Sequence, residues 1–260
     1  MRLAVEAPIQ ALPIIEELTD FNFVLTHLVL QDKRYADWYT ASRKFTMLDC
    51  STFELGHPVT VEELKQAINI IHPNVVIAPD HLHDAEATKT SLFQFLIDFD
   101  FFIKQPTTRR ILVGAVLQGK TLTEVRQLHS LYARLKELYY IYVPYDLELK
   151  EFQYIEHDET RHMVARLAVL ATIAPLARTS GKHYHLLGVG LPVELLIAKQ
   201  YPFVTSVDTS APIVAAIQKL KPLEVKQKLI RPDNYFELEI SQELEKEIRH
   251  SVQRFKILVT

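Results

Sequence analysis

Short runs of apolar, β-branched or aromatic residues recur along the chain, and most are separated by segments with helical spacing. Such runs are typical of buried strands, and their alternation with helices is the pattern of a parallel sheet joined by crossover helices. Eight runs fit this description: 2–6, 23–29, 45–49, 74–80, 111–118, 140–146, 183–189 and 204–208. The pattern therefore predicts an α/β fold of the (β/α)8 type, a TIM barrel.

The segments between the strands have the apolar spacing of helices that cover a sheet. The best-marked helix follows Thr60, because Thr60 and Glu63 have the spacing of a capping box. Helices are predicted at 61–71, 91–102, 123–139, 158–177 and 192–199, and after the last strand at 211–220 and about 241–255. Repeats, low-complexity segments and Gly/Ser linkers are absent from the sequence, so residues 1–260 are predicted to form one domain.

Composition and charge narrow the classes of function. The 260 residues are 48% hydrophobic, and 29 Lys and Arg oppose 32 Asp and Glu. With a formal net charge of −3, any nucleic-acid contact would have to be a local patch. The single cysteine, Cys50, excludes an internal disulfide and a multi-cysteine zinc site, and it fits a reducing cytoplasm. No export signal or membrane-spanning run is recognised, so we expect a cytoplasmic protein without a membrane partner.

Polar residues end several of the predicted strands. In such barrels the catalytic groups lie at the C-terminal strand ends, where the loops gather around one mouth. Four residues occupy these positions: Asp49, Asp80, Gln118 and Asp208. A single strand-end aspartate is more often a helix cap or a turn residue. A group of carboxylates in one mouth, however, suits chemistry at an acetal-like carbon, where one attacks and a second moves a proton. Asp208 and Asp49 are the natural pair.

Four segments carry a resemblance to a known enzyme family. The run LLGVGLPVE at 186–194, followed by VDTSAP at 207–212, resembles the tRNA-guanine transglycosylases, in which an LMGVGTPEDL run precedes the strand that ends in the nucleophilic aspartate. The other segments are 47–54, which resembles the TDSGGFQ run, 75–80, which resembles the strand with a base-reading aspartate, and 113–119, which resembles GIVQGG. The resemblance covers about residues 45–212, in the family's order.

The chain also departs from this family's pattern. It lacks the Cys-x-Cys-x2-Cys and His zinc site and the arginine after the LP segment, and Cys50, Ser51 and Thr52 replace a serine and paired glycines. The glycine pair after the sixth strand has become 143–145, Val-Pro-Tyr. Because the zinc subdomain lies beside the RNA-binding surface in the family, its loss puts a tRNA substrate in doubt. The chain is similar instead to the compact, zinc-free phage and bacterial DNA-guanine transglycosylases, which place 7-deazaguanine derivatives into DNA.

The resemblance implies a role for each matching residue. Asp208 would attack C1′ of a deoxyguanosine, expel guanine and hold the sugar covalently until an incoming deazaguanine displaces it. Asp49 would transfer the proton of the departing or incoming base, which requires a pKa near neutral. Asp80 would accept hydrogen bonds from a guanine edge, and Gln118 would donate to its O6. The other predicted ligand contacts are Gly119, Phe53 as a stacking ring, and Gly188, Val189 and Gly190, where the backbone could approach closely.

The implied partners are DNA and a free 7-deazaguanine base, with 7-cyano-7-deazaguanine as the family-level expectation and with no cofactor or metal. A base within a duplex would have to be flipped out or presented on a single strand. Basic residues cluster before two of the strands, and we interpret them as members of a solvated face. They are Arg161, Arg166, Arg178, Lys182 and His183 before the seventh strand, and Lys104, Arg109 and Arg110 before the fifth.

Three alternatives remain open on the sequence. The first is tRNA as the substrate. The second is a metal-dependent hydrolase, because His81 and His83 with Asp208 resemble the amidohydrolases, although the His-x-His follows the fourth strand rather than the first. The third is a noncatalytic, partner-binding subunit, which the presence of both Asp49 and Asp208 disfavours.

Overall fold

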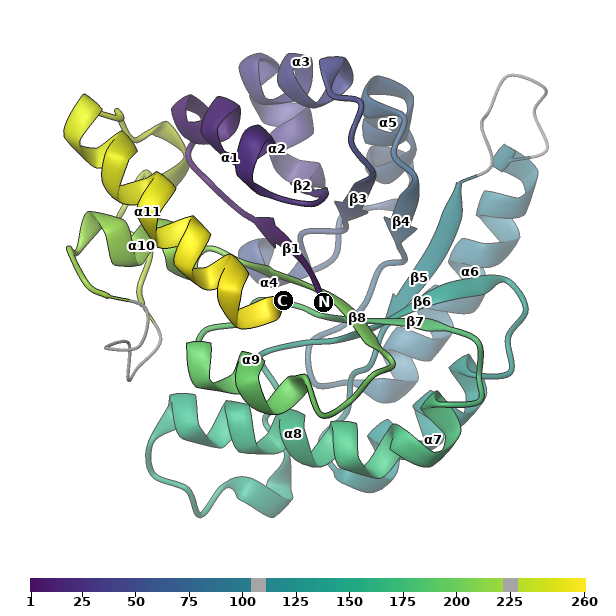
Figure 1. The fold of residues 1–260 in the computed structure, drawn as a ribbon. Helices are drawn as coiled ribbons and strands as arrows, with labels where there is room; N and C mark the ends of the chain where they lie inside the picture. Colours follow the sequence, from purple (N-terminus) through teal and green to yellow (C-terminus); the bar gives the residue numbers. More distant parts are fainter. Residues whose placement is uncertain (104–110, 222–228) are drawn as a thin grey trace.

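Eight parallel strands form the barrel (Figure 1) in the residues that the computed structural model describes, which are 1–103, 111–221 and 229–260. The strands are β1 (Arg2–Val5), β2 (Asn22–Leu25), β3 (Thr46–Asp49), β4 (Val75–Ile77), β5 (Leu112–Val116), β6 (Leu138–Val143), β7 (His183–Leu186) and β8 (Val204–Thr209). Their order in the sheet is β1-β8-β7-β6-β5-β4-β3-β2, so chain neighbours are also spatial neighbours. The predicted (β/α)8 fold is confirmed.

The barrel closes between β1 and β2 through Asp20, which precedes β2. The main-chain N–H of Asp20 donates to the carbonyl of Leu3 at 2.9 Å, and its carboxylate accepts from the N–H of Leu3 at 2.9 Å. One aspartate therefore satisfies both backbone groups of Leu3 at the seam.

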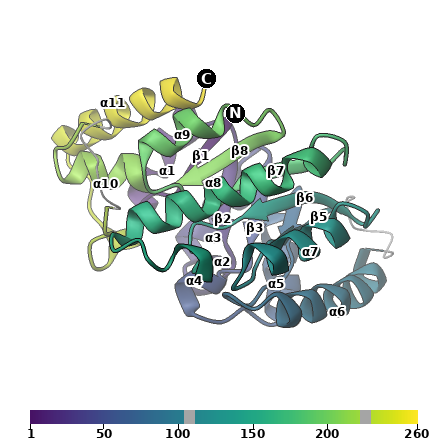
Figure 2. The same ribbon diagram turned by 90° about the horizontal axis from the view of Figure 1, so that it is seen from below.

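Helices surround the strands (Figure 2). They are α1 (Leu12–Leu18), α2 (Thr26–Gln31), α3 (Lys33–Ala41), α4 (Thr52–Leu55), α5 (Val61–Ile71), α6 (Ala85–Ile103), α7 (Leu122–Tyr132), α8 (Asp158–Ala177), α9 (Pro192–Ala198), α10 (Ala211–Ile217) and α11 (Gln242–Val259). The last helix packs against α10, α9, α1 and β1, and the amino group of Met1 donates to the carbonyl of Val259 at 2.8 Å. In the described part of the chain, no helix is both long and apolar enough to cross a membrane.

Several element boundaries differ from the sequence prediction. The helix predicted over 91–102 begins already at Ala85, and the strand predicted over 74–80 ends at Ile77. The run predicted as a strand over 23–29 ends at Leu25, and its second half is α2. The spacing of apolar residues does not distinguish a buried strand from a short buried helix. The helix begins at Thr26, whose hydroxyl donates to the carbonyl of Asp49 at 2.5 Å. The helix predicted over 123–139 ends at Tyr132, and β6 already begins at Leu138.

Aromatic rings and one histidine fill the barrel beneath its mouth. His185 on β7 is fully buried and stacks on Phe23 at a centroid distance of 5.6 Å and an interplanar angle of 7°. Phe21 meets the same imidazole edge-on at 5.9 Å, and Tyr142 lies at 5.1 Å. This layer places a hydrogen-bonding side chain directly below the strand ends.

Gly114 on β5 is required by this packing. A Cβ added there would lie 2.3 Å from Cε2 of Tyr142 and 2.9 Å from Cβ of Tyr140 on the adjacent β6, where the register of the two strands shifts. We expect Gly114→Ala to lower the free energy of unfolding by about 1–3 kcal/mol, the usual cost of overpacking, as measured by urea denaturation. The cost should shrink in a Tyr142→Leu background, and an equal cost in both backgrounds would contradict the clash.

Candidate active site

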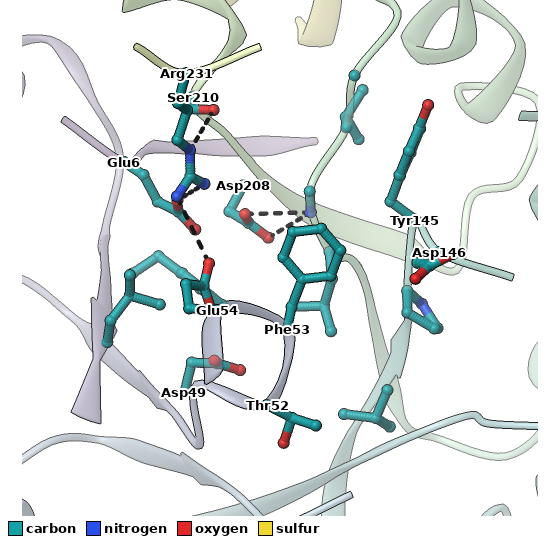
Figure 3. A pocket seen from close by; sticks show the side chains of 18 of the residues that line it. Glu6, Asp49, Thr52, Phe53, Glu54, Tyr145, Asp146, Asp208, Ser210 and Arg231 are labelled. Carbon is teal, nitrogen blue, oxygen red and sulfur yellow. Dashed lines mark hydrogen bonds and ion pairs between the residues drawn. The ribbon is translucent and has the colours of Figure 1, made fainter. Parts of the chain in front are cut away.

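A cavity of about 510 Å³ lies at the C-terminal strand ends (Figure 3). All of the predicted site residues except one line it: Asp49, Phe53, Asp80, Gln118, Gly188, Val189, Gly190 and Asp208. The exception is Gly119, which is not among the lining residues; a Cβ added to it would lie 3.1 Å from Cγ2 of Val125 and 3.2 Å from Cβ of Glu124 on α7. The structure therefore gives Gly119 no direct contact with the cavity.

Asp208 on β8 is held by donors from β7 and from the loop after it. Nε2 of His185 lies 2.8 Å from Oδ1 of Asp208, and Nδ1 of the same ring lies 2.9 Å from Oγ of Ser206. The N–H of Gly188 donates to both carboxylate oxygens, at 3.1 and 3.2 Å. These contacts fix the carboxylate at the cavity wall, with the imidazole beneath it.

The loop between β7 and α9 is pinned to β8. The N–H of Val189 donates to the carbonyl of Asp208 at 3.0 Å, and the hydroxyl of Thr209 donates to the carbonyl of Val189 at 2.5 Å. Gly188 has a φ of +61°, a left-handed conformation that favours glycine. The glycine thus turns the chain so that its N–H points at Asp208.

Asp49 ends β3 on another wall of the cavity. Its Oδ2 accepts from the N–H of Ser51 at 2.7 Å, and its side chain is buried. Burial raises the pKa of Asp49 well above its usual range, and the nearby carboxyl groups of Glu54, Asp80 and Asp208 raise it further. These surroundings favour the protonated form of Asp49, which suits a proton donor at the cavity wall.

Asp80 and Gln118 form a buried, hydrogen-bonded pair. Nε2 of Gln118 donates to Oδ2 of Asp80 at 2.7 Å, while its Oε1 accepts from the N–H of His83 at 3.0 Å. The thiol of Cys50 donates to Oδ1 of Asp80 at 3.2 Å. Gln118 thus orients Asp80, and only its second amide hydrogen remains for a ligand.

A charged cluster at the cavity was not predicted from the sequence. The guanidinium of Arg231 contacts the carboxyl group of Glu6 and lies 3.6 Å from Oε1 of Glu54. Its Nε also donates to the hydroxyl of Ser210 at 3.1 Å. Glu6 directly follows β1, so its strand-end position could have identified it. Arg231 belongs to a Pro-punctuated connection that carries no such signal.

Phe53 projects from α4 over the cavity (Figure 3). More than half of its surface, 53%, is exposed, which is unusual for a phenylalanine. Ile230, at 81% exposure, also lines the cavity. These side chains give the entrance an apolar surface of the kind on which a planar ring can stack.

The interpretation of the basic cluster as a solvated face is wrong for Arg166. Its side chain is fully buried, and its Nη2 lies 2.6 Å from Oε2 of Glu194. Among the others, Lys182 donates to the carbonyls of Leu135 and Leu138 at 2.6 Å. The remaining members Lys104, Arg109 and Arg110 lie outside the described residues. Arg166 is therefore not a surface residue, and its bond to the carbonyl of Leu187 supports the loop between β7 and α9.

The histidines behind the metal-hydrolase alternative do not meet in the cavity. Nε2 of His81 lies 2.8 Å from the hydroxyl of Ser91 on α6, and Nε2 of His83 lies 3.3 Å from Oδ2 of Asp146. Neither histidine lines the cavity. Within residues 1–103, 111–221 and 229–260, no group of three or more His, Cys, Asp or Glu side chains is placed to hold a metal ion.

No protein-family model and no curated protein sequence matches this chain. Among solved structures, N-(5′-phosphoribosyl)anthranilate isomerase from Pyrococcus furiosus is similar with a TM-score of 0.47 and 14% identity, over 96% of this chain and 99% of that chain. A variant of the citrate synthase SbnG has a TM-score of 0.44 and 14% identity, over 84% of this chain and 93% of that chain. Likenesses this low carry no argument about function, and the fold rests on the sheet itself.

Proposed function

We propose that this chain is a base-exchange glycosyltransferase that replaces guanine in DNA with a 7-deazaguanine derivative through a covalent aspartyl-sugar intermediate. The observation that carries the proposal is the pairing of Asp208 with Asp49 across one cavity. Asp208 is held by hydrogen-bond donors, whereas burial among other carboxyl groups raises the pKa of Asp49. Displacement at an anomeric carbon requires one carboxyl group that attacks and a second that supplies a proton.

The two steps of the exchange balance with these two residues. In the first, an oxygen of Asp208 bonds to C1′ while the C1′–N9 bond breaks, and the departing guanine takes the proton of Asp49. In the second, the incoming base gives its N9 proton to Asp49, its nitrogen bonds to C1′, and the ester bond to Asp208 breaks. Both residues return to their starting states, so no external acid or cofactor is consumed.

The cavity offers suitable contacts for a guanine-like ring. The oxygens of Asp80 are held by Gln118 and Cys50 and can still accept hydrogen bonds from the N1–H and the amine of a guanine edge. Phe53 can cover the face of the ring, as aromatic side chains do with flipped bases. A volume of about 510 Å³ is within the range of small-ligand sites.

The charge of the lining indicates which part of a nucleotide enters. Within the part of the chain that the structure describes, six carboxyl groups and one guanidinium line the cavity: Glu6, Asp49, Glu54, Asp80, Asp146 and Asp208 with Arg231. Phosphate groups would be repelled from such a floor, whereas the donor-rich edge of guanine would be attracted. We therefore infer that a flipped base and its sugar enter, and that the phosphates stay outside the mouth.

Incorporation of labelled guanine tests the proposal directly. The purified protein is incubated, without added metal, with labelled guanine and either DNA or tRNA, and the label retained in each polymer is counted. Label in DNA alone supports the proposal. Label in tRNA alone would instead assign the older substrate of the family, and label in neither would remove the base-exchange reaction.

Asp49→Asn is expected to slow exchange by about 10²–10⁴-fold, the usual contribution of a positioned proton donor. Single-turnover formation of the DNA adduct is the measurement. Because 7-methylguanine leaves without needing a proton, DNA that contains this base should restore most of the rate of the first step. The exposed Asp37→Asn on α3 serves as the matched control. Equal slowing with both bases would contradict the role of Asp49.

A further inference from the structure

The carboxyl group of Glu6 lies beside Asp208, yet neither step of the proposed base exchange uses it. Glu6 follows β1, its N–H donates to the carbonyl of Thr209 at 3.1 Å, and Ala4 is in register with Asp208. Its side chain is only 6% exposed and lines the cavity. A buried carboxyl group next to a proposed nucleophile requires an explanation, because burial of a charge is costly.

Charged and titratable groups face Glu6 from every element packed against it. Arg231 contacts its carboxyl group, and Glu54 on α4 lies 3.6 Å from the same guanidinium. The side chain of Asp208 lies beside Glu6 on the paired strand β8, where both line the cavity. The hydroxyl of Tyr235 donates to the carbonyl of Glu6 at 2.7 Å, and the buried phenols of Tyr35 and Tyr39 lie behind on α3. Glu6 and Glu54 thus share one guanidinium, and Asp208 lies beside Glu6.

This balance of charge leaves Glu6 protonated at neutral pH. Burial raises the pKa of Glu6 to about 8, opposed by Arg231 and aided by Glu54 and Asp208. A protonated carboxyl group can donate one hydrogen bond, and an ionised one can only accept. The state of Glu6 therefore decides whether it supports or repels the Asp208 carboxylate.

We propose that Glu6 is a positioning residue that, in its protonated form, donates a hydrogen bond to Asp208 and holds the attacking oxygen toward C1′. The inference rests on the proposed function. The neighbours of β8 in the sheet are β7 and β1. His185 and Gly188 hold Asp208 from the β7 side, and Glu6 holds it from the β1 side. When Glu6 ionises it stays beside Arg231, and Asp208 loses one of its supports.

The test compares Glu6→Gln and Glu6→Ala with the wild type in single-turnover formation of the DNA adduct at a series of pH values. The amide of Gln can still donate to Asp208 but does not titrate, so the ratio of the Gln variant's rate to the wild-type rate should rise about tenfold between pH 7 and 10. Asp49 titrates in both proteins and cancels in this ratio. Glu6→Ala should be about ten- to a hundredfold slower, with an unchanged KM for the free base. A ratio that stays flat with pH, or an Ala variant as fast as the wild type, would overturn the assignment.

Unfolding as a function of pH separates this inference from the proposed function. A carboxyl group whose pKa is about 8 in the folded protein, against 4.5 ordinarily, favours folding when protonated. The wild type should therefore lose stability relative to Glu6→Gln as the pH rises from about 4.5 through 8. Glu247→Gln, exposed on α11, should keep the wild-type dependence. If the wild type loses stability with rising pH but forms no DNA adduct, only the proposed base exchange is refuted. If it forms the adduct but shows no such loss of stability, the role of Glu6 is refuted.

Discussion

Asp208→Asn and Asp208→Ala are expected to form no denaturation-resistant adduct with DNA, and exchange should fall by a factor on the order of 10³ or more. The reason is chemical, because neither an amide nor a methyl group can form the ester with C1′. The Asn side chain is of equal size and can still accept from the N–H of Gly188, so it removes the nucleophile with little change in packing. Labelled oligonucleotide resolved on a denaturing gel is the measurement.

Two comparisons make this result specific. Asp37→Asn on α3 changes an exposed aspartate in the same way and should form the adduct at the wild-type rate. Thermal unfolding of Asp208→Asn should remain cooperative, which shows that the loss is not one of folding. An adduct that persists in Asp208→Asn would mean that another group is the nucleophile, and Glu6 would then be the first to replace.

The fold was predictable because the apolar pattern agrees with local signals. The capping box of Thr60 and Glu63 is present, and α5 has the bounds predicted from it, Val61–Ile71. The strand ends at Asp49 and Asp208 agree with the prediction to within one residue, whereas β4, β5 and β6 end two or three residues before Asp80, Gln118 and Asp146. The end of the second strand was predicted wrongly because its apolar run continues unbroken into α2. Only the tertiary contact of Thr26 with Asp49 marks where the strand ends and the helix begins.

The candidate site was predictable only where it follows strand ends. Asp80 and Gln118 could be placed at the mouth, but their mutual hydrogen bond depends on how β4 and β5 are aligned. The pairing of Glu6 with Arg231 joins residues 225 positions apart, and nothing in the local sequence of Arg231 indicates its partner. The burial of Arg166 was missed for a similar reason: an arginine on a helix is expected to be exposed to solvent unless a buried partner is known.

Arg166→Met is expected to lower the free energy of unfolding by about 3–5 kcal/mol, because it leaves the carboxylate of Glu194 buried without its partner. Both side chains are fully buried, so solvent does not screen the loss. The guanidinium also donates to the carbonyl of Leu187 at 2.5 Å and lies 5.4 Å from the ring centre of Tyr145. Urea denaturation is the measurement, and a change below about 1 kcal/mol would show that the pair is not buried as described.

The double variant Arg166→Met, Glu194→Leu separates stability from the support of the cavity. Replacing a buried ion pair with apolar residues of similar size is often neutral, so most of the lost stability should return. The carbonyl of Leu187 would still lack its donor, and Leu187 directly precedes the Gly188 N–H that points at Asp208. Adduct formation should therefore remain about tenfold slow in a protein of nearly normal stability. A full recovery of the rate would mean that the loop is held by its bonds to β8 alone.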